Sequence, residues 1–107
     1  MNTLRFSHNW NNKLRNFIFS TIRKWDNDKH QYYASQLDQM FDVKLNETHI
    51  IDAKLVHIAR LQYKDIPFEM KALDTGLTEL DEIDEVFNKF GITANTMVLV
   101  LLFKRVI

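Results

Sequence analysis

The stretch MVLVLLF, residues 97–103, decides the fold of this chain. It is apolar at consecutive as well as alternate positions, and it has the length of a β-strand rather than that of a helix. Such a run is typical of a strand that is buried on both faces of a sheet. We therefore predict a central strand here, with the remaining elements arranged around it.

Alternating patterns predict the strands that surround this one. Residues 4–7 are a short candidate, and residues 17–23 (FIFSTIR) place apolar side chains on both faces of a second strand. Residues 40–45 and residues 49–60 flank an Asn46-Glu47-Thr48 turn, so they form a hairpin. In the returning strand of this hairpin, regular alternation puts His57 on the apolar side and predicts a hydrogen-bonded core residue.

Three helices are predicted from capping residues and apolar periodicity. The first covers residues 28–37 and is capped by Asp26 or Asn27. The second covers residues 66–75, with Asp65 as N-cap and Gly76 at its end, and the third follows a Thr78 capping box and ends at Gly91. This order of elements predicts an α+β domain with a mostly antiparallel sheet.

Length and composition limit the possible architectures. The chain has 107 residues, of which 46% are hydrophobic and 26% charged, so we expect one domain over residues 1–107. There is no cysteine, which excludes disulfides and thiolate metal sites, and no apolar run approaches the roughly 20 residues that span a bilayer. We expect a cytoplasmic protein with no membrane contact.

The net charge is zero, but the charges are unevenly distributed. Residues 1–25 hold five basic side chains and no acidic one, whereas residues 65–85 hold eight acidic side chains and a single lysine. One interpretation is that the acids form the solvated face of a helix. Another is that the basic segment, which also contains Trp10 and Trp25, binds a ligand that carries phosphate.

Four strings, together with the order of the elements, resemble the ASCH branch of the PUA-like superfamily. They are LRFSHNW at the start, STIRKW in the second strand, LDTGLTEL at a helix end and VLVLLFKR in the last strand. The resemblance implies a small, mostly antiparallel β-barrel with three helices packed around it. It also implies a cleft at the mouth of the barrel.

The resemblance also suggests which residues would be catalytic if the protein is an enzyme. The second strand of that family carries a Gly-x-Lys-x-x-Glu-x-Arg pattern, of which only Arg23 matches here. Thr21 stands at the Glu position, as it does in a small bacterial member that hydrolyses acetylated cytidine, and the family's acid falls on Asp74. The lysine position holds Ile18, which can act neither as base nor as nucleophile, and this argues against catalysis.

The same region supplies the candidate binding residues. An arginine recognises phosphate or a base edge through two parallel hydrogen bonds, although a structural pair between Arg23 and a carboxylate is an equally good interpretation. A tryptophan can stack on a base, or it can simply close one end of a barrel. The residues predicted to bind RNA or a nucleoside are Arg23, Lys24, Trp25, Trp10, His8 and Asn9.

These observations favour a module that binds RNA or a modified nucleobase or nucleoside. The first alternative is an amidohydrolase that acts on an acylated nucleoside through Thr21 and Asp74. The second alternative is a protein-interaction domain that uses the acidic helix of residues 78–90. Because the four histidines have no metal-ligand spacing along the chain, we expect no metal, and we expect no cofactor.

Overall fold

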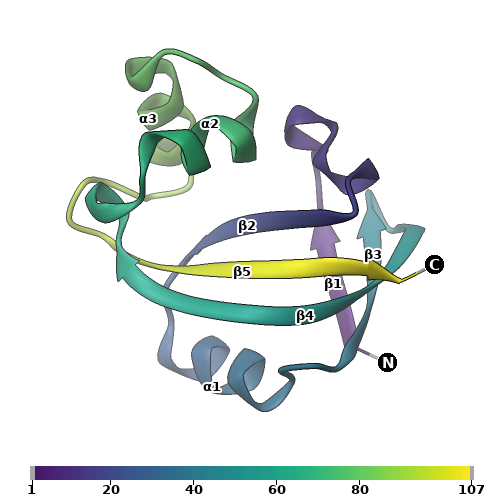
Figure 1. Ribbon diagram of the computed structural model, residues 1–107. Coiled ribbons are helices and arrows are strands. Elements are labelled where there is room, and N and C mark those ends of the chain that lie inside the picture. The colour runs from purple at the N-terminus through teal and green to yellow at the C-terminus, as the bar shows by residue number, and fades with distance from the viewer. Residues whose placement is uncertain (1, 107) are drawn as a thin grey trace.

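The computed structural model describes residues 2–106 and arranges five strands in one sheet, in the spatial order β1-β3-β4-β5-β2 (Figure 1). Strand β1 (Asn2–Phe6) runs parallel to β3 (Met40–Leu45). The other neighbours are antiparallel, namely β3 with β4 (Thr48–Gln62), β4 with β5 (Met97–Val106) and β5 with β2 (Ile18–Lys24). The predicted α+β class and mostly antiparallel pairing are confirmed.

Strand β5 is the buried central strand that its sequence predicts. It lies between β4 and β2, and it contributes to a hydrophobic cluster on each face of the sheet. Leu99, Leu101 and Phe103 belong to the first cluster, whereas Val98 and Val100 belong to the second. A strand with water on one face would alternate apolar and polar residues, so the continuous run follows from this double burial.

Helices cover both faces of the sheet (Figure 1). Helix α1 (Asn27–Ser35) adds Tyr33 to the first cluster. On the other face, Ile83 and Phe87 of α3 (Leu80–Lys89) belong to the second cluster, and α2 (Phe68–Thr75) lies beside α3. Within residues 2–106, no helix is long and apolar enough to cross a membrane.

The sheet does not close into the predicted barrel. Strands β1 and β3 cross the direction of the other three (Figure 1), so the sheet curls and brings its two edges, β1 and β2, near one another. A closed barrel needs a continuous backbone ladder, and none joins these edges in the described part of the chain. Side chains meet there instead, with the rings of Phe6 and Phe19 at 6.4 Å and an Arg23 hydrogen bond to the Arg5 carbonyl at 3.0 Å.

The helix ends follow the predicted signals in part. Asp26 caps α1 by accepting from the Lys29 amide at 3.0 Å, and Gly76 ends α2 in the left-handed conformation with φ 79°. The predicted N-caps of the other two helices are wrong. Asp65 lies in a short 3-10 turn, η2 (Tyr63–Asp65), so that α2 begins after Pro67, and no side chain caps α3.

A β-bulge corrects the prediction for His57. The register between β4 and β5 shifts between Leu55 and His57, so that one extra residue stands in β4. Because the inward and outward positions exchange at a bulge, His57 is exposed rather than in the core.

Candidate functional site

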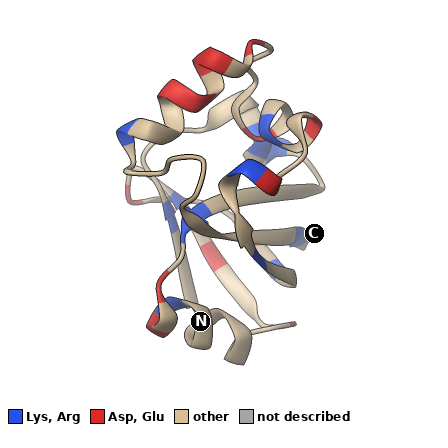
Figure 2. Cartoon of the chain, turned by 90° about the vertical axis from the view of Figure 1, so that its left-hand side faces the viewer, with Lys and Arg blue, Asp and Glu red and all other residues tan. Residues whose placement is uncertain are grey.

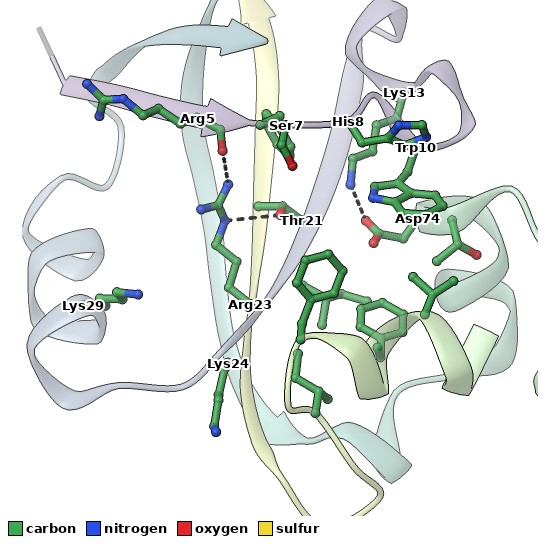
Figure 3. A pocket seen from close by; sticks show the side chains of 17 residues that line it. Arg5, Ser7, His8, Trp10, Lys13, Thr21, Arg23, Lys24, Lys29 and Asp74 are labelled. Carbon is green, nitrogen blue, oxygen red and sulfur yellow. Dashed lines mark hydrogen bonds and ion pairs between the residues drawn. The ribbon is translucent and has the colours of Figure 1, made fainter. Parts of the chain in front are cut away.

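A pocket of about 320 Å³ lies beside the β2 edge of the sheet (Figure 3). Its walls come from the end of β1, the turn-like segment η1 (Trp10–Arg15), β2, and the C-terminal parts of α2 and α3, with Lys29 added by α1. The lining includes five basic side chains, one acidic side chain and several rings: Arg5, Lys13, Arg23, Lys24, Lys29, Asp74, Phe6, His8, Trp10, Phe87 and Phe90.

Two left-handed asparagines and a glycine set the position of η1. Asn11 and Asn12 have φ of 55° and 54°, a region that asparagine tolerates better than most residues. The Asn11 amide donates to the Leu73 carbonyl at 2.8 Å, and a Cβ built on Gly76 would lie only 3.0 Å from the Asn11 Cβ. Glycine at position 76 thus both ends α2 and lets η1 approach it, which carries Lys13 into the pocket wall.

Lys13 and Asp74 form a buried ion pair in this wall. The Lys13 Nζ lies 2.9 Å from the Asp74 Oδ1, and the two side chains are only 5% and 6% exposed. The Ser20 hydroxyl donates to the same carboxylate oxygen at 3.1 Å. Burial lowers the pKa of Lys13, although the attraction of Asp74 opposes this shift.

Arg23 bridges the open seam of the sheet. Its Nε donates to the Thr21 hydroxyl at 3.3 Å, its Nη2 donates to the Arg5 carbonyl at 3.0 Å, and its guanidinium carbon lies 5.3 Å from the centre of the Phe6 ring (Figure 3). Burial lowers the pKa of Arg23, but a guanidinium keeps its charge at physiological pH. The side chain therefore adds a fixed positive charge to the pocket in a defined orientation.

The other cations of the lining are exposed to solvent. Arg5, Lys24 and Lys29 are all exposed, and Arg5 pairs with Glu47 at 3.2 Å. Four acidic side chains, Asp81, Glu82, Asp84 and Glu85, lie on α3, at the top of Figure 2. The acidic and basic segments of the sequence nevertheless meet at the Lys13–Asp74 pair.

An aromatic pair stands at the pocket. The rings of His8 and Trp10 meet edge to face with their centres 4.3 Å apart, and Trp10 is half-buried. Such a contact holds the indole in one orientation. A half-buried indole that lines a pocket has the form of a stacking platform for a planar ligand.

Six of the eight candidate residues lie around this pocket. They are Thr21, Asp74, Arg23, Lys24, Trp10 and His8. In the described part of the chain, Arg23 does not form the pair with a carboxylate that one interpretation of the sequence predicted. Its hydrogen bonds go to the Thr21 hydroxyl and the Arg5 carbonyl, whereas Asp74 is paired with Lys13.

Trp25 and Asn9 are not part of the lining. The Trp25 indole donates to His30 Nδ1 at 3.0 Å, packs against the first hydrophobic cluster and carries the Arg60 guanidinium 4.2 Å above its ring. The Asn9 side chain accepts from the Leu14 amide and donates to Asn12, so it holds the fold of η1.

Sequence reasoning missed Lys13, Arg5 and Lys29 as lining residues. The resemblance directed attention to position 18 for a lysine, and Ile18 is half-exposed at the start of β2, outside the lining. Lys13 instead comes from η1, eight positions before Thr21. The only available signal was its place in the asparagine-rich stretch that precedes β2, which does not by itself predict burial.

Comparison with known proteins supports the fold and not a particular activity. No family model and no curated protein matches the sequence. The crystal structure of an ASCH domain from Lactobacillus crispatus JV V101 is similar, with a TM-score of 0.63 and 14% sequence identity over 87% of this chain and 67% of that one. At that identity the likeness concerns the fold alone, and it agrees with the sheet and helix arrangement described above. The chain therefore has an ASCH-like fold.

Proposed function

We propose that the pocket binds a nucleobase-containing ligand, either a modified nucleoside or one nucleotide of an RNA. The observation that carries the proposal is the convergence of five cationic side chains and one half-buried indole on a single pocket. Within residues 2–106, Asp74 is the one acidic residue of the lining, and its pairing with Lys13 leaves four other cationic side chains there. PUA-like domains are often RNA-binding, so the ASCH-like fold supports the proposal at that general level.

The charges have the arrangement that binding of a phosphate-bearing ligand requires. Arg23 is held in place by Thr21 and Arg5, whereas Lys24 and Lys29 are exposed and free to follow a phosphate. Contacts of this kind supply affinity that falls as the salt concentration rises. The enclosed part of the pocket supplies selection instead, because only a ligand of suitable shape enters it.

The size of the pocket favours a single unit. A volume of about 320 Å³ is at the lower end of the range for small-molecule sites, which is roughly 300–1,000 Å³. Stacking on Trp10 would add about 1–3 kcal/mol per base. An RNA would thus insert one nucleotide while its neighbours remain on the cationic rim.

The two tryptophans give the proposal a direct test with an internal control. The full chain is titrated with cytidine, acetylated cytidine, cytidine 5′-monophosphate and a short single-stranded RNA, and the indole N–H signals are followed by NMR. We expect the Trp10 signal to shift and the Trp25 signal, whose indole is bonded to His30, to stay in place. A Trp10 signal that no ligand moves would refute the proposal.

Exposed lysines supply matched variants for the same titration. We expect the Lys24→Ala, Lys29→Ala double variant to lose about tenfold in affinity for the monophosphate and the RNA at low salt. The Lys54→Ala, Lys104→Ala double variant removes the same charge from a shallow site elsewhere on the sheet, and it should bind as the parent does. Equal losses in both variants would indicate nonspecific attraction rather than a site.

An amidohydrolase that acts on an acylated nucleoside is the second candidate, and Lys13 favours it. The lysine that the resemblance leads one to expect at position 18 is absent, but a buried lysine enters the same pocket as Thr21 and Asp74 from η1. In this alternative the Thr21 hydroxyl attacks the acyl carbonyl, and the Lys13–Asp74 pair takes its proton and passes it to the nucleobase amine as the C–N bond breaks. Water then hydrolyses the acyl-threonine, which releases the acid and restores the Thr21 hydroxyl.

Acetate release separates the two candidates. Under the second candidate, the parent protein releases acetate from acetylated cytidine, and Thr21→Val abolishes the release. Under the first, acetylated cytidine binds unchanged, so its acetyl signal persists while the Trp10 signal shifts.

A further inference from the structure

A second group of ligand-type side chains lies on the β3–β4 hairpin, outside the pocket. Asp42 comes from β3, and His49 and Asp52 come from β4. One donor atom from each of the three lies within 4.8 Å of the others. The residues between them, Phe41, Val43, Ile51 and Ala53, belong to the first hydrophobic cluster, so the group is on the opposite face of the hairpin.

The register of the hairpin places these three side chains on one face. Asp42 stands directly opposite Asp52. His49 and Asp52 are three positions apart, and in a regular strand they would therefore point to opposite faces. The register shifts between Val43 and Lys44, so that Val43 pairs with Ile51 and Lys44 with His49, which leaves Ile50 as the extra residue. A bulge of this kind redirects a side chain, and here it turns His49 toward the two carboxylates.

The protein balances the charges of the group only in part, at Asp42 and not at Asp52. Like charges that face one another across two strands are destabilising. Asp42 is in contact with His49 Nδ1 and has Lys44 at 3.9 Å. Within residues 2–106, no hydrogen bond or ion pair engages the Asp52 carboxylate. A cation at this place would remove the repulsion and supply Asp52 with a partner.

We propose that Asp42, His49 and Asp52 bind a divalent transition-metal ion, with Zn²⁺ as the best-fitting ion. One imidazole nitrogen and two carboxylate oxygens form a ligand set that suits Zn²⁺, and water completes the tetrahedral shell. The donor atoms must close to roughly 3 Å from one another, which rotation of the exposed His49 side chain and of the two half-buried aspartates would allow. The spacing of these residues along the sequence does not reveal the site, because the bulge is what brings the three side chains to one face.

The test uses the full chain after treatment with a chelator. Calorimetric titration with Zn²⁺ is expected to give one ion per chain, and NMR signals of the hairpin are expected to shift. The His49→Gln variant should bind at least about tenfold more weakly. The His57→Gln variant removes another exposed histidine of the same strand and should bind as the parent does.

Asp52→Asn gives a second, independent readout. Without metal this variant should melt at a higher temperature than the parent, because the repulsion between the facing carboxylates is gone. With Zn²⁺ the parent should gain melting temperature while Asp52→Asn gains little. The proposal is overturned if Zn²⁺ does not saturate the parent, if His49→Gln binds as tightly as the parent, or if the shifts occur at His8 or His30 instead.

Discussion

Two ion pairs stand at opposite extremes of exposure in this protein. Lys13 and Asp74, in the pocket wall, are 5% and 6% exposed, whereas Arg5 and Glu47, near the β3–β4 turn, are 61% and 69% exposed. The pairs have the same chemistry and similar distances, 2.9 Å and 3.2 Å. Their surroundings differ, since only the first has left water and gained a third partner, Ser20.

This difference in exposure indicates which charged side chains stabilise the fold. Two exposed charges exchange water for one another at little gain, so the pair is worth about 0–1 kcal/mol. Two buried charges have lost their hydration, and removal of either one leaves the other unsatisfied. Loss of either Lys13 or Asp74 alone should therefore weaken the packing of η1 on α2, whereas loss of Arg5 should leave the fold almost unchanged.

The largest expected effect is that of Asp74→Ala. It leaves the Lys13 ammonium buried without its partner, and we expect a loss of about 3–5 kcal/mol in the free energy of unfolding. Urea denaturation of the variant and the parent measures the difference. The Lys13→Met, Asp74→Leu double variant should recover most of the loss, because it removes both charges and keeps the volume. If Asp74→Ala lowers the free energy of unfolding by only about 0–1 kcal/mol, as expected for an exposed ion pair, burial does not make the Lys13–Asp74 pair more important than the Arg5–Glu47 pair.

Gly76→Ala should have the next largest effect. The substitution puts a side chain at φ 79° and brings its Cβ to 3.0 Å from that of Asn11, so η1 must move away from α2. We expect a cost of about 1–3 kcal/mol. Gly91→Ala is the control, because Gly91 has a similar φ of 77° but only the flexible Lys24 Nζ as neighbour, at 3.5 Å. Equal costs at the two glycines would mean that the close approach of η1 contributes nothing.

The hydrogen bond between Tyr63 and Asp84 should contribute more to stability than the exposed ion pair and less than the buried one. The Tyr63 hydroxyl donates to Asp84 at 2.6 Å while its ring is buried, and Tyr63→Phe should cost about 1.5–3 kcal/mol at neutral pH. Burial, together with the hydrogen bond to Asp84, raises the pKa of Tyr63 above its ordinary value of 10.0. The unfolded chain therefore loses this proton first, and the contribution of Tyr63 to stability falls as the pH rises above 10.

Denaturation curves measured at several alkaline pH values test this sign. The parent and Tyr63→Phe should approach one another in stability above pH 10. If the difference in their free energies of unfolding grows with pH instead, the folded state does not raise the pKa of Tyr63.

The smallest expected effect is that of Arg5→Ala, which should change stability by at most about 0.5–1 kcal/mol. The backbone carbonyl that accepts from Arg23 remains in this variant. Affinity for a phosphate-bearing ligand should nevertheless fall, because the pocket loses one of its cations. If thermal denaturation shows a large loss of stability instead, the fold depends on Arg5 as it does on the buried Lys13.

The elements that the sequence predicts well are those whose signals are local. The continuous apolar run of β5 indicates a strand buried on both faces. The Asn46-Glu47 turn follows from Asn46, because asparagine tolerates the positive φ that both residues adopt here. The ends of α2 and α3 coincide with Gly76 and Gly91 for the same reason.

The features that it predicts poorly depend on contacts between distant segments. The bulges that expose His57 and redirect His49 have no residue signature, so strict alternation gives the wrong face. The burial of Lys13 results from the packing of η1 on α2, and an exposed lysine would have the same local sequence. Closure of the sheet likewise depends on how far the two edge strands approach one another, which no single strand encodes.

The central position of β5 has a consequence for the rate of folding. Ile18 pairs with Lys104, and neither hydrophobic cluster is complete without residues of β5. Loops that span most of the chain must therefore close before burial compensates for the lost entropy, and topologies of this kind fold in milliseconds to seconds rather than in microseconds. Until β5 docks, the apolar faces of β2 and β4 remain open to other chains, so β5 is also the strand that protects the protein from aggregation as it folds.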